Sequence, residues 1–461
     1  MTPELAVQTF STEQIEEPAI DFVVTEVGHD ARVEQAVVAV VAVVGLGYVG
    51  LPTAIALRGA GVRIVGIDIA QHRLEEIRAG RAELLGPEQE QLQAHLQDGG
   101  FVLTDRIDAL TAADLVLICV PTPIDAQRRP DPRALRAACA SVVEHARSGQ
   151  TFVLTSTTYV GTTRELLVEP LAERGLRVGE DVFVAFAPER IDPGVIEHEQ
   201  LSTPRVIGAV TETCFRRAAE QLRHTCKEIH RVSSPEAAEM VKLYENTFRA
   251  VNIALAFEMA EACKAHGLDP IEVTDGAATK PFGFMAHYPS AGVGGHCIGV
   301  DPHYLLHPLR ENGRPATVAE EAMRKVAGRP RHVVWRAHEL LAHGGGRLRD
   351  ARVLVVGVSY KPGVADSREA PAVEIIERLM AEDAHVDFHD PYVSSLRIDG
   401  ETMHGVDPDP RRDKSGFGPE DYDLAIIVTV HPDHDYGWLR RCPRVLDCTY
   451  RTPAGGQRFV P

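Results

Sequence analysis

Residues 36–50 read AVVAVVAVVGLGYVG, a run of small and branched apolar residues that ends in a glycine-rich turn. A continuous valine-rich run predicts a strand buried on both faces, as in a parallel sheet. The turn has the pattern GxGxxG, made by Gly45, Gly47 and Gly50, and residues 51–58 read as a helix. This glycine pattern alone is weak evidence, but strand, glycine turn and helix in this order are typical of a dinucleotide-binding fold.

The cofactor is predicted from the next strand. That strand is expected at residues 63–67 and ends in Asp68, about 20 residues after the glycines. An acidic side chain at this place hydrogen-bonds the ribose 2′-hydroxyl of NAD and repels the 2′-phosphate of NADP. Tyr48 and Val49 complete the predicted NAD site. Arg73 lies near Asp68 in sequence and keeps NADP open as an alternative.

Polar residues follow two further buried strands, expected at residues 114–120 and 152–155. In open α/β sheets, ligands bind beyond the carboxyl ends of the strands. These residues are therefore expected near the nicotinamide end of the dinucleotide, with ordinary turn and cap chemistry as the alternative. They are Pro121, Thr122, Thr157 and Thr158.

Two charged pairs also follow strand ends. They are Glu189 with Arg190, after a strand expected at 182–186, and Lys361 with Arg368, after one expected at 351–356. The second pair precedes a helix expected from Pro371, and cations beside a helix N-terminus suit a diphosphate. Solvated surface charges are the alternative for both pairs. The region after residue 351 has no GxGxxG, so no second dinucleotide is expected there.

A helix of about 30 residues is expected at 235–266, long for a globular protein. Its start has the signature of a capping box between Ser233 and Glu236, and Gly267 is the expected stop. Lys242 and Asn246 are spaced i, i+4 and therefore share one face. Such a pair is often simply solvated, but the length of the helix suggests a central spine and a dimer contact.

Residues 292–305 read GVGGHCIGVDPHYL and hold Cys297 between glycines and an Asp-Pro pair. Gly294 and Gly295 allow backbone to approach a ligand closely, because they have no Cβ atom. A thiolate at this place is a candidate nucleophile for an aldehyde carbon, and Asp301 is the nearby acid. A buried structural cysteine is the alternative, since free cysteine is among the most buried residue types.

Length and composition limit the classes of protein and of partner that are possible. A chain of 461 residues predicts about three domains, and 44% hydrophobic with 25% charged residues is ordinary for a globular protein. The net charge of −18 disfavours nucleic acid and anionic membrane as partners. Eight cysteines without CxxC spacing argue against zinc and against a disulfide framework, and favour the cytoplasm. No apolar run is long enough to cross a membrane, and the acidic N-terminus does not read as a signal peptide.

Seven motifs in order resemble the UDP-glucose/GDP-mannose dehydrogenase family, the nucleotide-sugar 6-dehydrogenases. They are GLGYVGLP at 45–52, VPTP at 120–123, STTYVGTT at 156–163, APERIDPG at 187–194, Lys242 with Asn246, GVGGHCIGVDP at 292–302, and GVSYKPGVADSREAPA at 357–372. The resemblance implies two Rossmann-like doubly wound domains joined by the long helix. The expected regions are an extension at 1–36, an NAD-binding domain at 37–215, a central helical domain at 216–330 and a UDP-sugar domain at 331–461.

The resemblance also implies a reaction, the oxidation of a nucleotide sugar at C6 to a carboxylate with two NAD+. Cys297 would form a thiohemiacetal and then a thioester. Lys242 and Asn246 would stabilise charge on the C6 oxygen, Asp301 would assist proton transfer, and Glu189 and Thr157 would contact water and substrate. Arg190, Gly294, Gly295, Lys361 and Arg368 are the expected substrate contacts.

The motifs around Cys297 and Glu189 resemble the branch acting on UDP-N-acetylhexosamines, UDP-N-acetylglucosamine in particular. UDP-glucose and UDP-N-acetylmannosamine are the alternatives. Gly299 and Pro193 depart from family patterns, and Pro193 replaces a second glutamate, so the group that activates the hydrolytic water stays open. A two-electron hydroxyacid-type dehydrogenase and a non-catalytic NAD-binding protein are the other hypotheses. A homodimer or higher oligomer is expected.

Overall fold

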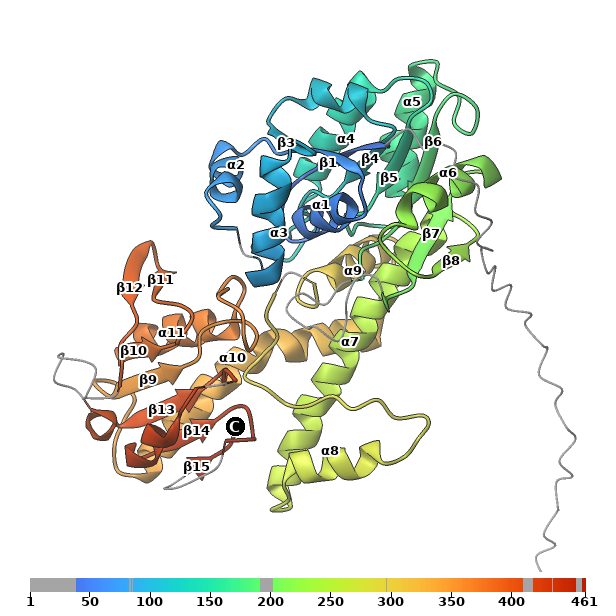
Figure 1. Ribbon diagram of the computed structural model, residues 1–461. Coiled ribbons are helices and arrows are strands. Elements are labelled where there is room, and N and C mark those ends of the chain that lie inside the picture. Colours follow the sequence, from blue (N-terminus) through green and yellow to red (C-terminus); the bar gives the residue numbers. More distant parts are fainter. Residues whose placement is uncertain are drawn as a thin grey trace, which may run out of the picture. The chain divides into compact units, whose positions relative to one another are not determined.

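A computed structural model of the chain describes residues 39–82, 84, 86–190, 202–295, 297–408, 418–432, 434–452 and 458–461. They belong to one compact unit, Val38–Pro461. The extension expected at residues 1–36 lies outside the described residues, and so does Pro193. The predicted fold class is confirmed, since the described residues form two doubly wound α/β sheets connected through long helices (Figure 1).

The first sheet has eight strands in the order β3-β2-β1-β4-β5-β6-β7-β8 among the described residues, and only the β6–β7 pair is antiparallel. The order of its first six strands is that of a dinucleotide-binding sheet. The strands are β1 (Val40–Val44), β2 (Arg63–Ile67), β3 (Phe101–Thr104), β4 (Leu115–Ile118), β5 (Thr151–Leu154), β6 (Phe183–Phe186), β7 (Arg205–Ala209) and β8 (Ile229–Val232).

Helices cover both faces of this sheet, which is why its central strands are apolar throughout (Figure 1). One face packs against α1 (Gly50–Gly59), α2 (Gln71–Arg78), α3 (Gly86–Gln97) and α6 (Glu212–Leu222). The other face packs against α4 (Arg133–His145) and α5 (Glu169–Glu173).

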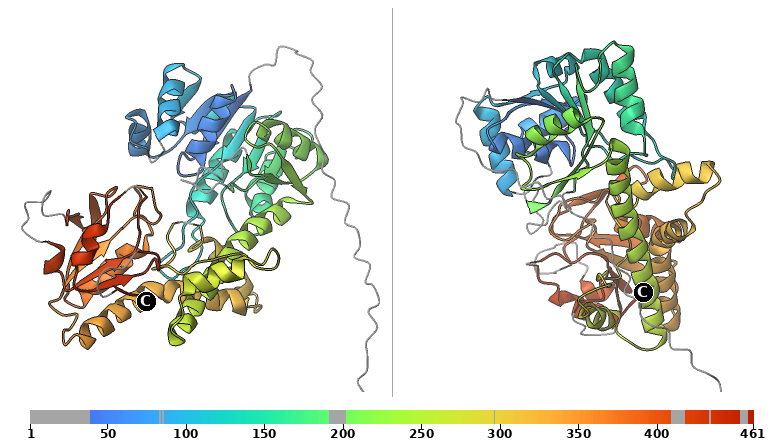
Figure 2. Two further views of the ribbon diagram at one scale, coloured as in Figure 1. Left: turned by 60° about the horizontal axis from the view of Figure 1, so that its bottom comes forward. Right: turned by 90° about the vertical axis from the view of Figure 1, so that its right-hand side faces the viewer.

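The long helix α7 (Pro235–Ala265) packs against α8 (Pro270–Ala278), α9 (Asp301–Glu311) and α10 (Thr317–His343), and Figure 2 shows it beside α10. Gly267 ends it with φ of 70°, as expected. The predicted capping box at Ser233 is wrong, because the cap is Ser234, whose Oγ accepts from Ala237 N at 3.2 Å. Pro235 explains the difference, since the residue before proline is held extended, as an N-cap must be. Glu236 instead pairs with Arg164 at 2.8 Å.

The second sheet is parallel, with the order β10-β9-β13-β14-β15 in the described part of the chain. Helices α10 and α11 (Pro371–Ala381) pack on one face. A hairpin of β11 (Ser395–Ile398) and β12 (Glu401–His404) is separate from it. The strands of the sheet are β9 (Arg352–Val356), β10 (His385–His389), β13 (Leu424–Ile427), β14 (Val445–Asp447) and β15 (Arg458–Phe459). Of the helices described, none is long and apolar enough to span a membrane.

Candidate active site

The three glycines after β1 each meet a different steric need. Gly45 has φ of 91°, and a Cβ there would lie 2.7 Å from the carbonyl oxygen of Cys119. A Cβ on Gly50 would lie 1.9 Å from the carbonyl oxygen of Gly45, so α1 approaches the turn too closely for a side chain. A Cβ on Gly47 would meet no protein atom within 4 Å. Tight turn, open approach and close helix packing are the three roles of glycine in a dinucleotide site.

Asp68 is fixed at the carboxyl end of β2. Its carboxylate accepts from Leu46 N and from Ala70 N, both at 2.9 Å. Arg73 donates its Nε to the carbonyl oxygen of Leu46 at 3.0 Å, so its guanidinium supports the glycine turn. A carboxylate held beside this turn fits the ribose diol of NAD.

The polar tips of β4 and β5 are tied to each other and to α9. Ser156 Oγ donates to the carbonyl oxygen of Val120 at 2.8 Å. Tyr304 on α9 donates to the carbonyl oxygen of Pro123 at 3.0 Å, and Thr122 lies in hydrogen-bond contact with the same tyrosine. The three neighbouring residues differ in their surroundings. Pro121 is exposed, and Thr158 Oγ1 lies 2.9 Å from Thr162 Oγ1. Thr157 forms a hydrogen bond with Asp301.

Asp301 is a buried acid that contacts residues of α7 and of the loop after β5. It opens α9 and is only 4% exposed. Asn246 donates its Nδ2 to Asp301 Oδ2 at 2.5 Å, and Thr157 donates to the same carboxylate. Burial raises the pKa of Asp301 from 3.8 to about 6, although the charge of Lys242 and the two hydrogen bonds act in the opposite direction. The carboxyl group therefore titrates near neutral pH, as a general acid or base must.

Cys297 differs from the other seven cysteines, which are all buried, because it is exposed. The alternative of a buried structural cysteine is therefore wrong. Its carbonyl oxygen accepts from Asp301 N at 2.8 Å, which joins the segment around Cys297, called the thiol loop below, to the start of α9. A Cβ on Gly294 would lie 2.7 Å from Tyr360 Cβ, and one on Gly295 would lie 3.3 Å from the same ring. These glycines let the thiol loop pack directly on Tyr360.

Lys242 and Glu189 meet through backbone. Lys242 Nζ donates to the carbonyl oxygen of Glu189 at 2.8 Å. The Glu189 carboxylate pairs with Arg205 on β7 at 3.1 Å, and both side chains are nearly buried. Arg190 is directed to Glu245 on α7 at 2.6 Å. The charged pair predicted from sequence is thus split between two different partners.

Sequence reasoning missed Arg205 and a second residue, Glu239. Glu239 is buried on α7 and accepts from Gly161 N, Thr163 N and Thr163 Oγ1 at 2.5, 2.8 and 2.6 Å. It fixes the loop that carries Thr157. The available signal was its spacing, because Glu239 precedes Lys242 by one helical turn and so shares its face.

A contact between the two sheets' regions joins Tyr48 of the glycine turn to Asp366. The Tyr48 hydroxyl donates to Asp366, and Arg368 pairs with Asp366 at 3.0 Å while its guanidinium lies 4.8 Å from the centre of the Tyr48 ring. Burial would raise the pKa of Asp366, but these two hydrogen bonds lower it overall. Lys361 is partly exposed in the loop between β9 and Asp366. Of the two predicted anion-site cations, Arg368 therefore lies close to the cofactor turn.

The fold and its glycine turn define an NAD-binding protein with a second α/β domain. Comparison with known families says which kind, because the NAD binding, central and UDP binding domains of one family match residues 39–229, 236–326 and 354–449. The chain belongs to the UDP-glucose/GDP-mannose dehydrogenase family, as its motifs predicted. It is an NAD-dependent nucleotide-sugar dehydrogenase.

Three relatives illustrate the match. A UDP-N-acetyl-D-mannosamine dehydrogenase from Pyrococcus horikoshii is 36% identical over 85% of this chain and 90% of its own length. A UDP-N-acetyl-D-glucosamine 6-dehydrogenase from Pseudomonas aeruginosa is 35% identical over the same shares. A solved structure of a UDP-D-ManNAc dehydrogenase from Pyrococcus horikoshii has a TM-score of 0.81 at 32% identity and covers 91% of this chain and 98% of its own.

Proposed function

We propose that this protein oxidises the C6 primary alcohol of a UDP-N-acetylhexosamine to the carboxylate, through a covalent intermediate on Cys297. The observation that carries the proposal is the exposed Cys297, whose backbone is bonded to the same Asp301 that Asn246 contacts. A single two-electron dehydrogenase has no use for a thiol so placed. A non-catalytic NAD-binding protein has no need for an exposed thiol beside a buried carboxyl group.

The chemistry needs a nucleophile, a proton carrier and a site for negative charge. The C6 alcohol first loses a hydride and a proton to become the aldehyde. The Cys297 thiolate adds to this aldehyde, and the resulting thiohemiacetal loses a second hydride and a proton to become a thioester. Water then hydrolyses the thioester, which releases the acid and the thiol. Lys242 and Asn246 stabilise charge on the C6 oxygen. Asp301 carries protons, and Glu189 and Thr157 contact water and substrate.

Each of the two oxidations transfers one hydride to an NAD+ molecule, and the chain supplies the site that holds it. Gly47 leaves room for the diphosphate, and Asp68 presents oxygens to the ribose. Further proposed cofactor contacts lie in the turn and at the strand tips. They are Gly45, Tyr48, Val49, Gly50, Arg73, Pro121, Thr122 and Thr158.

The UDP end of the substrate is assigned to the second domain. Lys361 and Arg368 are proposed to contact the diphosphate, with Arg190, Gly294 and Gly295 nearer the sugar. Relatives named for N-acetylglucosamine and for N-acetylmannosamine are about equally similar to this chain. UDP-N-acetylglucosamine is our first choice, because of the motif around Glu189, and UDP-N-acetylmannosamine and UDP-glucose are the alternatives.

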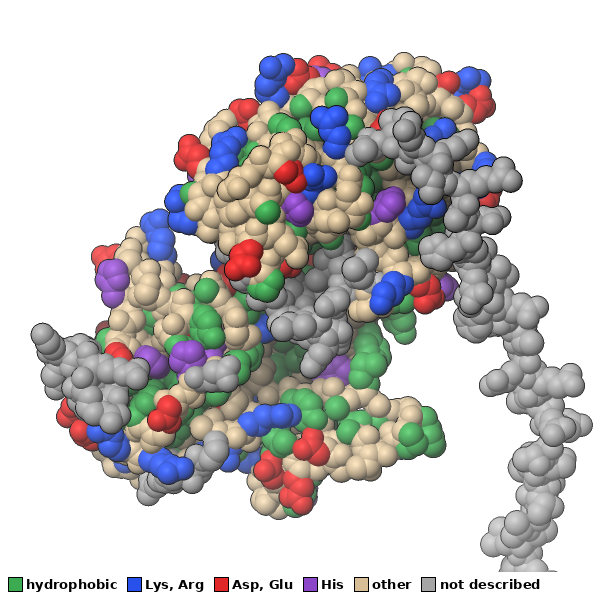
Figure 3. All heavy atoms as spheres, in the orientation of Figure 1, with side chains coloured by type: hydrophobic (Ala, Val, Ile, Leu, Met, Phe, Trp, Pro, Cys, Tyr) green, Lys and Arg blue, Asp and Glu red, His purple; other side chains and the backbone are tan. Residues whose placement is uncertain are grey.

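A dimer through α7 is also proposed. Large apolar side chains lie exposed along α7 and in the segment after α8. Figure 3 shows hydrophobic side chains at the surface in this part of the molecule. They include Tyr244, Phe248, Leu255, Met259, Phe282 and Met285. Contiguous exposed apolar side chains of this kind mark protein contacts.

The test is to incubate the purified protein with each UDP-sugar and NAD+ and to count NADH and acid formed. We expect two NADH per acid, with a UDP-N-acetylhexosamine preferred. One NADH per sugar would exclude the four-electron scheme. Turnover on UDP-glucose alone would exclude the proposed substrate and leave the chemistry intact.

A further inference from the structure

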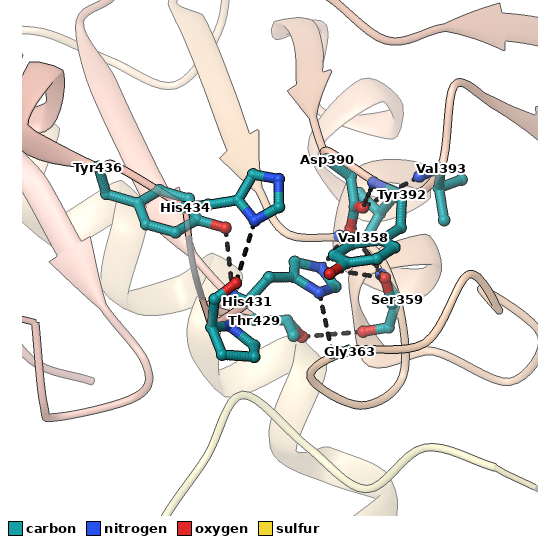
Figure 4. Close-up of polar contacts among 11 residues, drawn as sticks. Val358, Ser359, Gly363, Asp390, Tyr392, Val393, Thr429, His431, His434 and Tyr436 are labelled. Carbon is teal, nitrogen blue, oxygen red and sulfur yellow. Dashed lines mark hydrogen bonds and ion pairs between the residues drawn. The ribbon is translucent and has the colours of Figure 1, made fainter. Parts of the chain in front are cut away.

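Three buried polar residues meet at the carboxyl edge of the second sheet. Ser359 follows β9, Asp390 follows β10 and His431 follows β13, and Figure 4 shows the three side chains converging. Ser359 and His431 are each 1% exposed and Asp390 is 8% exposed. The strand ends of a parallel α/β sheet are where such a fold places its ligands, so this cluster occupies a functional position.

Asp390 uses its acceptor capacity on the protein itself. Oδ2 accepts from Val358 N at 2.7 Å, from Ser359 N at 3.1 Å and Ser359 Oγ at 2.9 Å, and from His431 Nε2 at 3.1 Å. Oδ1 accepts from Tyr392 N at 2.8 Å and Val393 N at 3.0 Å. A carboxylate has about four lone-pair sites, so none is left for a ligand. Burial opposes ionisation, but these bonds together hold the pKa of Asp390 well below its usual range.

The first domain uses the same arrangement with a different outcome. Asp68 accepts from the turn after β1, as Asp390 accepts from the turn after β9. Gly357 begins its turn with φ of 79° and lies against the carbonyl of Thr429, as Gly45 lies against that of Cys119. In the second domain His431 Nε2 is a further donor to the corresponding carboxylate. Because the acceptor sites of Asp390 are all used within the protein, the cluster is suited to holding the chain in place and not to binding a nucleotide.

His431 ties the two ends of one loop together. Gly363 N donates to His431 Nδ1 at 3.0 Å, and because a backbone N–H only donates, Nε2 is the nitrogen that carries the proton toward Asp390. Ser359 Oγ lies 3.2 Å from the same Nε2. Thr429 Oγ1 donates to the carbonyl oxygen of Ser359 at 2.8 Å. Both ends of the loop 359–363 are therefore held by residues that follow β13.

The loop so fixed carries residues of the proposed active site. Tyr360 packs against Gly294 and Gly295, which lead into the thiol loop. Its backbone N–H donates to the carbonyl oxygen of Asp366 at 2.8 Å. Lys361 follows at once. A displaced loop would move Tyr360, which packs against Gly294 and Gly295, and Lys361, the proposed diphosphate contact.

We propose that Ser359, Asp390 and His431 are positioning residues for the nucleotide-sugar reaction, which hold the loop 359–363 in the conformation that binds UDP and supports the thiol loop. This inference rests on the proposed function, in which the loop meets the diphosphate. None of the three residues needs to touch the substrate.

The test is the affinity of His431 variants for UDP, measured by calorimetry, beside their affinity for NADH. His431→Ala is expected to weaken UDP binding about tenfold, the order expected when buried hydrogen bonds are lost, and to leave NADH affinity within about twofold. His431→Asn keeps an acceptor for Gly363 N and is expected to recover part of the loss. The control is His385→Ala, which removes an exposed histidine at the opposite end of β10 from Asp390.

The outcomes distinguish a failure of the proposed function from a failure of the positioning role. If the wild-type protein fails to bind UDP, the proposed function is wrong. If wild type binds UDP and a folded His431→Ala variant binds it equally well, or loses NADH to the same extent, the positioning role is wrong. Should His431→Ala not fold, Ser359→Ala removes a single hydroxyl, and unchanged UDP affinity in that variant overturns the inference.

Discussion

Replacing Asp301 by asparagine should remove the acid limb of the pH–rate profile. In the wild-type protein the rise of the Asp301 pKa from 3.8 to about 6 corresponds to about 3 kcal/mol in favour of the protonated acid. The ionised form therefore predominates only above about pH 6. Because the ionised carboxylate is the proton acceptor in our scheme, kcat should fall about tenfold per pH unit below that value.

The assay is the initial rate of NADH formation from roughly pH 5 to 8 with saturating UDP-sugar. Asp301→Asn should be slower by about 10² to 10⁴ and flat across the acid range. Asn246→Ala is the matched control, because the Asn246 bond lowers the pKa of Asp301, so its loss should move the limb to higher pH. An Asp301→Asn variant that keeps the wild-type acid limb would refute the assignment.

The same shift has a consequence for folding. A group with a raised pKa contributes stability that is present below pH 3.8 and is lost as the pH rises through about 6. Relative to Asp301→Asn, the wild-type protein should therefore lose up to about 3 kcal/mol of unfolding free energy between about pH 4 and 7. Denaturant unfolding at both pH values measures the difference, and an equal change in the two proteins would contradict it.

Three further predictions concern the cofactor turn, its contact and the thiol. Gly47→Ala should fold normally but weaken NADH binding. Gly50→Ala should lower the melting temperature, because its Cβ would lie 1.9 Å from the Gly45 carbonyl oxygen. Scanning calorimetry measures the melting temperatures of both variants, and calorimetric titration with NADH measures their affinities. Tyr48→Phe removes the bond to Asp366 and should cost about 1 kcal/mol in unfolding free energy, with no change meaning that the contact is not stabilising. Cys297→Ala should abolish acid formation and retain NADH binding, which product analysis beside a fluorescence titration can check.

Features set by local geometry could be predicted from the sequence. The valine run, the glycine turn and Asp68 specify the first βαβ unit, and the periodicity of α7 places Lys242 with Asn246 on one face. Gly267 as helix stop and Pro371 as helix start follow from the same local rules. The cap of α7 was misplaced by one residue, because the effect of Pro235 on Ser234 outweighs the capping-box pattern.

The remaining contacts depend on tertiary packing that no short pattern encodes. Ser359 and His431 are 72 residues apart and meet only because β9 and β13 are neighbours in the sheet. Arg205 reaches Glu189 across the antiparallel pair of β6 and β7, a pairing that the doubly wound pattern does not predict. The function of the thiol was open for the same reason, since exposure of Cys297 is a property of the folded chain.

The most direct test of the covalent scheme is to stop turnover with acid and weigh the intact protein, then map any adduct by peptide mass spectrometry. We expect a UDP-hexosaminuronyl adduct on Cys297 in the wild-type protein and none in Cys297→Ala. Acid formation at the wild-type rate by the alanine variant, or an adduct on a different residue, would contradict the account.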